Sequence, residues 1–299
     1  MKDRVALVVS SAIALVAAIE VAAPFAPLLH QWWLALVVTI GGTYVLFAGI
    51  GALRTTDGRA AGVACLGGAL LAGSFAFAAF LGGKPERVPA APGQTYRPAH
   101  SAGVWVEFPA VSPPAKAGIL WPGTVVVRGP FGSQTASPGQ IVRVGAFVLK
   151  IDSGPISLVD ARSANGEPVT VTQPNGADFL SRYLTFGGLD GDKPEDYFAV
   201  PAVHRTVQVD YWSGLPSRGI DVPFLVMRIA EENGGTLFEG VAVSGRPLKR
   251  AGLILTFMLG DYPVVTASSA PPLVAFWAGV AMVIAGTILQ AIRTMRARS

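Results

Sequence analysis

Cysteine is almost absent from this chain of 299 residues, in which Cys65 is the only one. A single thiol excludes an intrachain disulfide, a CxxC redox pair, covalent haem attachment through CxxCH and a cysteine-rich zinc site. Any domain outside the reducing cytoplasm must therefore fold without disulfides. A domain of about 185 residues can bury enough apolar surface to do so.

Charge is also scarce. Only 14% of the residues are charged and 51% are hydrophobic, whereas a soluble domain has about 25% charged residues. The deficit is concentrated in the first 83 residues and in 270–292, a run without Asp, Glu, Lys or Arg. The stretch between them has ordinary polarity. This distribution indicates a membrane protein with one sizeable water-exposed domain.

The net charge of +4 and the pI of about 9.4 do not indicate a nucleic-acid partner. Many of the basic residues flank the apolar runs, which is the pattern of the positive-inside rule: Lys2, Arg4, Arg54, Arg59, Arg293, Arg296 and Arg298. No nucleic-acid-binding motif accompanies the others. We therefore expect the lipid bilayer, and no nucleic acid, as a partner.

Four apolar runs are long enough to cross a bilayer, at 5–29, 32–53, 60–82 and 272–292. The first could also be a signal peptide that is cleaved near its Ala-rich end. We favour a retained helix, because the run is long and Pro24 and Pro27 lie where cleavage would fall. An even number of spans and the basic flanks predict an inner-membrane protein with both termini in the cytoplasm and residues 84–269 outside it.

Small residues are frequent in the second and third runs, and Ala69 and Gly73 form a small-xxx-small pair. They are typical of membrane helices in general, and also of a tight helical hairpin or a partner interface. Glu20 is the one carboxylate within a span. About 24 Å of helix separates it from Arg4, so we expect its side chain to reach the outer surface.

Between the third and fourth runs, the sequence predicts an extracytoplasmic all-β domain, sandwich-like or barrel-like, at 103–269. Residues 84–102 are rich in Pro, Gly and Ala and read as a linker after a unit of three helices at 1–83. Ten short β-type runs follow, among them "VWVEF" at 104–108, divided by turn signals such as "DSGP" at 152–155. The pattern breaks at 175–200, where 175–184 is a short helix candidate. The unit 270–299 is the last helix with its basic tail.

No active site emerges from the residues. The acidic stretch with Asp190, Asp192, Glu195 and Asp196 lacks the EF-hand pattern, so we interpret it as a solvated loop. The serines in "VSGRPL" and "WSGLPS" are not in a G-x-S-x-G elbow, and phosphate-binding glycine loops are absent. We therefore predict that the chain is not an enzyme.

Three histidines remain, His30, His100 and His204. His30, beside Trp32 and Trp33, and His100, in the linker, would both lie near the outer membrane face. There an imidazole pair could ligate haem iron, although both are also compatible with ordinary interfacial residues. His204 precedes a predicted strand and reads as structural or surface-exposed.

The C-terminal stretch from Val241 resembles the ResB family, membrane proteins of system II cytochrome c maturation. The resemblance is carried by a "PL…G" turn at Pro247, Leu248 and Gly252 and a strand with Tyr262, Val264 and Val265. A proline-containing helix entry follows at Pro271 and Pro272, and then the helix residues Trp277, Gly279 and Gly286. The order of elements is also similar, with three helices, a large β-rich outer domain and a final helix. The chain is shorter than a typical member, and Ala270-Pro271-Pro272 replaces the usual Asp-Pro-Gly.

The resemblance implies an accessory, non-enzymatic component that works beside a polytopic haem-handling membrane protein. Its outer domain would support haem delivery or present the apocytochrome through shape and edge-strand contacts. Haem is a possible cofactor, and apocytochrome c a possible partner. The alternative is an accessory subunit of a membrane respiratory or electron-transfer complex, with the β domain as its docking platform.

Overall fold

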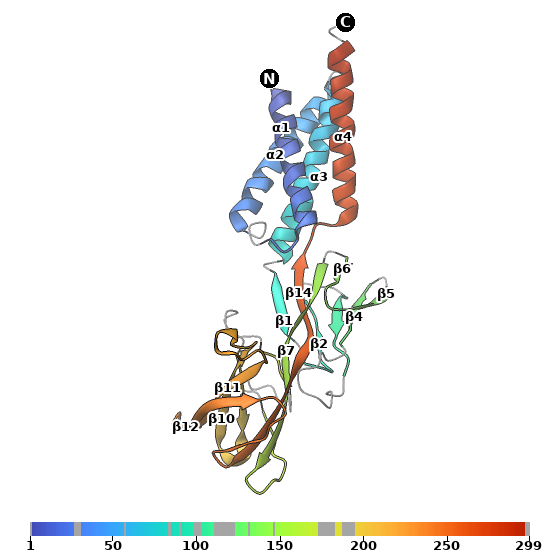
Figure 1. The fold of residues 1–299 in the computed structure, drawn as a ribbon. Coiled ribbons are helices and arrows are strands. Elements are labelled where there is room, and N and C mark those ends of the chain that lie inside the picture. Colours follow the sequence, from blue (N-terminus) through green and yellow to red (C-terminus); the bar gives the residue numbers. More distant parts are fainter. Residues whose placement is uncertain are drawn as a thin grey trace.

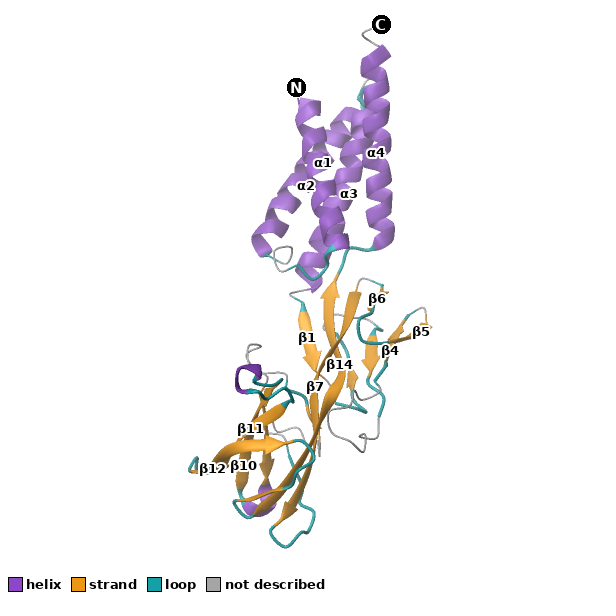
Figure 2. Ribbon diagram, in the orientation of Figure 1, coloured by secondary structure: helices purple, strands orange, loops and turns teal. Residues whose placement is uncertain are grey.

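The protein was analysed as a computed structural model. It describes residues 2–26, 31–56, 58–82, 85–89, 91–98, 103–110, 123–130, 132–145, 147–172, 183–186 and 195–296. A helical bundle forms one end of the molecule and a β-rich region the other, and both chain termini lie at the end of the bundle that points away from the strands (Figure 1). Figure 2 shows this division of helices and strands.

The bundle contains α1 (Lys2–Ala22), α2 (Trp32–Leu53), α3 (Arg59–Gly82) and α4 (Leu273–Arg296). All four are long and apolar enough to cross a membrane, as predicted, and α2 has the predicted bounds. The first helix is shorter than expected, because it ends at Ala22 instead of continuing to residue 29. Pro24 explains this end, since its ring and missing N–H do not allow an α-helix to continue.

Small residues bring the helices of the bundle close together. A Cβ atom added at Gly67 of α3 would lie 2.7 Å from the carbonyl oxygen of Gly279 in α4. In the same way, Gly49 of α2 lies against Cys65 and Gly62 of α3. The tight helical hairpin expected from the small residues is therefore present. Gly73 is not part of it, because a Cβ atom there would meet nothing.

Antiparallel strands build the β-rich region, as predicted. One sheet has the order β1-β14-β7-β6, with β8 and β13 attached, and contains β1 (Glu86–Pro89), β6 (Ile141–Val144), β7 (Phe147–Ser163), β8 (Tyr183–Leu184), β13 (Leu248–Arg250) and β14 (Leu253–Ser269). A second sheet, in the order β2-β3-β4-β5, contains β2 (Thr95–Tyr96), β3 (Trp105–Glu107), β4 (Val125–Gly129) and β5 (Gly132–Ala136).

The third sheet has the order β12-β11-β10-β9. It contains β9 (Glu195–Val200), β10 (Arg205–Trp212), β11 (Phe224–Glu231) and β12 (Thr236–Val243), with the short 3-10 helices η2 (Pro201–Val203) and η3 (Pro216–Arg218) in the connections. The β2–β5 sheet lies nearer the helical bundle than the β9–β12 sheet does (Figure 1). We therefore call the β2–β5 side the proximal lobe and the β9–β12 side the distal lobe.

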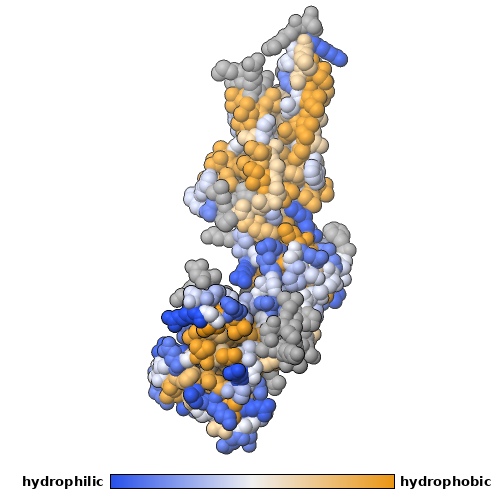
Figure 3. All heavy atoms as spheres, in the orientation of Figure 1, coloured by the Kyte–Doolittle hydropathy of each residue, from blue (hydrophilic) through white to orange (hydrophobic). Residues whose placement is uncertain are grey.

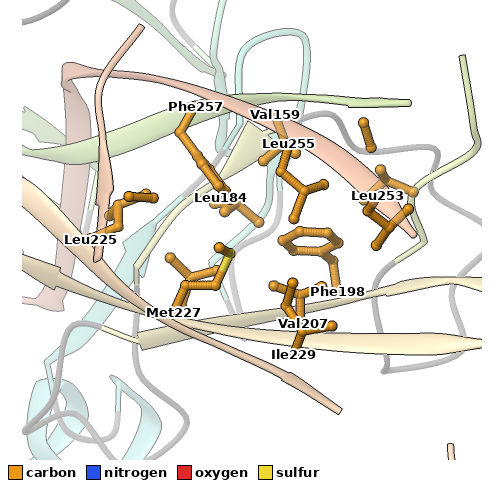
Figure 4. Packing of buried hydrophobic residues seen from close by; sticks show 14 of the residues in the cluster. Val159, Leu184, Phe198, Val207, Leu225, Met227, Ile229, Leu253, Leu255 and Phe257 are labelled. Carbon is orange, nitrogen blue, oxygen red and sulfur yellow. The ribbon is translucent and has the colours of Figure 1, made fainter. Parts of the chain in front are cut away.

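The two longest strands, β7 and β14, connect the lobes. Each has 17 residues, and they pair without interruption from Leu253 opposite Ser163 to Ser269 opposite Phe147. Their halves nearer the helical bundle pack against β3 and β4 around Phe108, Val127 and Tyr262. Their far halves pack against the β9–β12 sheet, where Phe198, Phe257 and Met227 point toward one another (Figure 4). One ribbon thus belongs to both hydrophobic cores.

The alternation predicted for "VWVEF" is confirmed, since Val104, Val106 and Phe108 are buried and Trp105 and Glu107 are less so. The prediction of a turn at "DSGP" is wrong. This segment lies inside β7, with Gly154 opposite Tyr262. A Cβ atom at Gly154 would come within 2.5 Å of Val264, so close packing against the facing strand explains this glycine.

The predicted linker at 84–102 is also partly structured. It contributes β1, which pairs with β14, and β2, which pairs with β3. Both strands are short and pair with distant parts of the chain, which a local pattern does not reveal. A helix was predicted at 175–184, but its last two residues form the strand β8 (Tyr183–Leu184). The other residues of this segment lie outside the described part of the chain.

Candidate functional site

The two histidines predicted as haem ligands, His30 and His100, lie outside the described residues. Their proximity to each other therefore stays a prediction. His204 follows η2 in a left-handed conformation with φ 52°. Its exposed ring places Nδ1 3.2 Å from Oε2 of Glu232, a surface contact that agrees with the expected role.

Part of the predicted acidic loop is ordered structure. Asp190 and Asp192 lie outside the described residues, but Glu195 and Asp196 begin β9. The Asp196 carboxylate accepts hydrogen bonds from the backbone N–H groups of Thr185 and Tyr197, at 2.9 and 2.7 Å. Burial raises the pKa of Asp196, and these N–H donors act in the opposite direction. The interpretation as a solvated loop is therefore wrong for Asp196, which joins β8 to β9.

The described residues offer little to bond-making chemistry. No group of three or more His, Cys, Asp or Glu among them could hold a metal ion. Cys65 is buried in α3. In "VSGRPL", the hydroxyl oxygen of Ser244 accepts a hydrogen bond from the backbone N–H of Leu259 at 2.9 Å, which is a structural role.

Glu20 does not reach the surface as expected, since it is only 1% exposed. Arg143 of β6 is the basic residue of the β-rich region that interacts with Glu20. Burial lowers the pKa of Arg143, and the electrostatic attraction of Glu20 raises it. Glu20 Oε2 and Arg143 Nη1 are both buried and have no hydrogen-bond partner in the described part of the chain. Glu20 and Arg143 thus interact only at longer range, without a hydrogen bond or an ion pair between them.

The most unusual surface lies on the outer side of the distal lobe, where apolar side chains are aligned across three strands. In one row Trp212 of β10 pairs with Phe224 of β11, which pairs with Val243 of β12. In the next row Asp210 of β10 pairs with Val226 of β11, which pairs with Val241 of β12, so this row is apolar only on β11 and β12. The neighbouring residues Leu225, Met227 and Ala242 are buried. Because side chains alternate along a strand, the two rows point away from the core.

We call the five apolar residues of these two rows, together with Ile220 and Val222 of the β10–β11 connection, the apolar face. Trp212 and Phe224 stack with ring centroids 6.1 Å apart and an interplanar angle of 9°. Even so, Trp212 is 45% exposed, Val241 53% and Val222 61%. Figure 3 shows an apolar area on the distal lobe over β10–β12, surrounded by polar residues. Contiguous exposed apolar area with a polar rim is typical of an interaction site.

The apolar face reaches the edge of its sheet. β12 is the last strand in the order β12-β11-β10-β9, and no described strand pairs with its other side. Edge strands are commonly protected by lysine, proline or inward-pointing charge. β12 has the sequence TLFEGVAV, in which Glu239 is the only charged residue. Such an edge can accept an additional strand from a partner.

Polar residues border the apolar face on the same sheet. Arg228 of β11 lies opposite Glu239 of β12 and Gln208 of β10, and its Nε donates to Thr236 Oγ1 at 2.8 Å. A shallow hollow of about 200 Å³ lies among Tyr197, Gln208 and Arg228. The outer face of the sheet therefore has an apolar half and a hydrogen-bonding half.

This surface was not predicted from the sequence. A signal was nevertheless present, because "PFLVMRIA" and "TLFEGVAV" are apolar at both odd and even positions. A strand with one face in solvent is expected to alternate apolar and polar residues, and a strand that is apolar on both faces is expected to be covered on both. The excess of apolar residues in these two strands could have indicated that one of their faces is apolar and exposed.

Comparisons with known proteins add no relative: no protein-family model matches the chain, and neither a curated protein nor a solved structure shows detectable similarity to it.

Proposed function

We propose that this chain is a membrane-anchored docking component of cytochrome c maturation, as its resemblance to the ResB family implies. Its four apolar helices cross the inner membrane, with both termini in the cytoplasm and the β-rich region outside. The chain makes and breaks no bonds itself. It holds a partner, either the apocytochrome or the outer face of a haem-handling membrane protein, while haem is delivered.

The apolar face is the observation that carries this proposal. Two rows of outward apolar side chains end at the unprotected edge of β12. An extended segment of the partner can continue the sheet along β12 and place apolar side chains beside Val241 and Val243. Backbone hydrogen bonds would then supply affinity largely independent of sequence, and the apolar rows would select the side chains. An apocytochrome, which has not yet folded, can supply such a segment.

The arrangement of the chain also supports the role. β14 connects the distal lobe to α4, so a partner held at the apolar face stays at a set position relative to the bilayer. A haem-handling protein in the same membrane could then transfer haem to a substrate that does not diffuse away.

The test is deletion of the gene in its native host, followed by measurement of covalently bound haem in membrane proteins. We expect c-type cytochromes to be lost and to return with the wild-type gene. A Val241→Lys/Val243→Lys variant should not restore them, because each lysine would have to be desolvated under the partner. The matched control is Ile141→Lys on β6, where the isoleucine is 62% exposed but outside the apolar face.

Two results would contradict the proposal. Unchanged c-type cytochromes after deletion would remove the role in maturation. Purification in fixed stoichiometry with a respiratory complex would identify the chain as an accessory subunit of that complex, the alternative considered from the sequence.

A further inference from the structure

Glu20 lies on the side of α1 that packs against the rest of the bundle. The buried residues of this helix follow one another at alternating spacings of four and three, which places them on one face: Ala6, Ser10, Ile13, Ala17 and Glu20. This face is turned toward α3, because a Cβ atom added at Gly68 would lie 2.8 Å from the Cβ atom of Ser10. Glu20 is the last residue of the buried face, so its side chain points into the protein.

The direction of the side chain explains why Glu20 does not reach the water around the β-rich region. Side chains of a helix lean toward its N-terminus, and the N-terminus of α1 lies at the end of the bundle away from the strands (Figure 1). Glu20 therefore leans back into the bundle. Its Oε2 is buried and has no hydrogen-bond partner among the described residues. An ionised carboxylate is unfavourable in such surroundings.

Arg143 approaches the same end of α1 from the sheet. It lies opposite Val148 of β7, which lies opposite Ser268 of β14. Ser268 donates its hydrogen bond to the carbonyl of Pro24, two residues past the end of α1. Arg143 thus belongs to the row of the sheet that contacts the end of the helix. Its Nη1 is buried as well, and within the described ranges it too has no hydrogen-bond partner.

The other charged and titratable groups on the elements around Glu20 are more remote. The charged residues of the helices lie toward the opposite end of the bundle, namely Lys2, Asp3, Arg4, Arg59, Arg293 and Arg296. Tyr44 and Cys65 are each about 18 Å or more along their helix from the end nearer the strands. On the sheet, Arg87 and Lys150 lie in the next row, opposite Thr266, and Lys150 pairs with Asp152 at 2.9 Å. In the described part of the chain, Arg143 is therefore the charge that acts on Glu20.

Two opposite charges that are buried without touching each other are unfavourable, because each has lost water and gained no partner. The guanidinium group of arginine keeps its charge in proteins, so the arrangement is relieved if the carboxyl group is neutral. From these contacts we infer that Glu20 is a proton-binding site, and that it releases its proton when Arg143 moves in to pair with it. The O–H bond of the carboxyl group then breaks, the proton passes to water, and the carboxylate accepts hydrogen bonds from the guanidinium group.

The proton on Glu20 and the position of Arg143 are linked in this way. Protonation favours the arrangement in the structure, with the two groups apart, and ionisation favours a paired arrangement with β6 closer to the end of α1. A partner that draws the β-rich region toward the bundle would therefore release the proton, and acid would oppose that movement. The inference depends neither on the role in cytochrome c maturation nor on the apolar face.

Infrared spectroscopy of the full-length chain in detergent tests the protonation, because a protonated carboxyl group absorbs separately from carboxylates. Near neutral pH we expect a protonated-carboxyl band that is lost in Glu20→Gln, a variant with the size of the neutral group. The matched control is Glu232→Gln, since the Glu232 side chain is 61% exposed and its loss should leave that band unchanged. Glu20→Gln should also unfold at the wild-type temperature, because it replaces a neutral group by a neutral group.

Variants of Arg143 test the link between the two residues. In Arg143→Gln the band of Glu20 should persist to higher pH than in the wild type, by about one pH unit, because the charge that favours the carboxylate is gone. Arg143→Lys keeps a positive charge and should retain most of the wild-type pH profile. Arg87→Gln is the control, since Arg87 is an exposed arginine of the next row, and it should leave the profile unchanged.

Three outcomes would overturn the inference. Absence of the Glu20 band near neutral pH would show an ionised carboxylate, and a markedly lower unfolding temperature of Glu20→Gln would indicate a buried ion pair that the variant breaks. A pH profile that is the same in Arg143→Gln and in the wild type would remove the link to Arg143. Each result can occur while deletion of the gene still abolishes c-type cytochromes, so failure here is distinguishable from failure of the proposed function.

Discussion

The hydroxyl of Ser269 donates a hydrogen bond of 2.8 Å to the carbonyl oxygen of Ala78. Ser269 is the last residue of β14, and Ala78 lies in the final turns of α3. Beside it, Ser268 donates to the carbonyl of Pro24 at 2.8 Å. Two consecutive serines thus attach the end of the long strand to two different parts of the bundle before the chain enters α4.

Replacement of Ser269 by alanine should reduce the free energy of unfolding by about 1 kcal/mol, the net contribution of a typical buried hydrogen bond. Thermal unfolding of the detergent-purified chain measures the effect. Ser133→Ala on β5 is the control, because Ser133 is exposed and its loss should leave the unfolding temperature unchanged. An equal effect of the two variants would show that the junction bond contributes no stability.

Phe257→Ala should be far more damaging, with a loss of about 3–5 kcal/mol from the cavity and the lost burial. The side chain is fully buried between the two layers of the distal lobe, with its ring centroid 6.5 Å from that of Phe198. Chemical denaturation followed by tryptophan fluorescence measures the loss. If the shared ribbon couples the lobes, the proximal lobe will unfold in the same transition, and two separate transitions would contradict that coupling.

Trp212→Ala should weaken partner binding by about 2 kcal/mol or more, or about 30-fold in affinity, because tryptophan is enriched among the hot spots of interfaces. Stability should change little, since nearly half of this residue is already in contact with solvent. Co-purification of the partner protein from native membranes measures the loss, and Ile141→Ala is the control. Full recovery of the partner with Trp212→Ala would exclude the apolar face as the docking surface.

Asp196 should make stability depend on pH. Its pKa is raised in the folded protein by burial, so the folded state binds this proton more tightly than the unfolded chain. The stabilising contribution is complete below the unfolded pKa of about 3.9 and is lost as the pH rises through the raised folded value. Denaturation at a series of pH values gives the free energy of unfolding as a function of pH. The slope of this dependence should be smaller for Asp196→Asn than for the wild type between these two pKa values. A slope identical to the wild type would contradict the assignment.

The sequence predicted the elements that depend on local composition. Residues 32–53 form a helix with the predicted bounds, because twenty or so apolar residues without proline have few alternatives. The alternation of Val104, Val106 and Phe108 likewise matched a half-buried strand. In both cases the pattern of apolar residues within one short segment is enough to predict the element.

The features that depend on distant pairing were not predictable in this way. "DSGP" has turn-forming residues, yet its Gly154 is required by the side chain of Val264 on a strand more than a hundred residues later. β1 has a proline at its end, and among the described strands it pairs with β14 alone. The residues of the apolar face are neighbours only through the pairing of β10 with β11 and of β11 with β12. The register of both pairs must be known before the face can be recognised.

The uninterrupted pairing of β7 with β14 also has a mechanical consequence. A force that bends the distal lobe relative to the bundle would have to bend both strands of this ladder of 17 facing residues. It would also disturb both hydrophobic cores, because the two strands contribute side chains to each. We therefore expect the two lobes to move as one body.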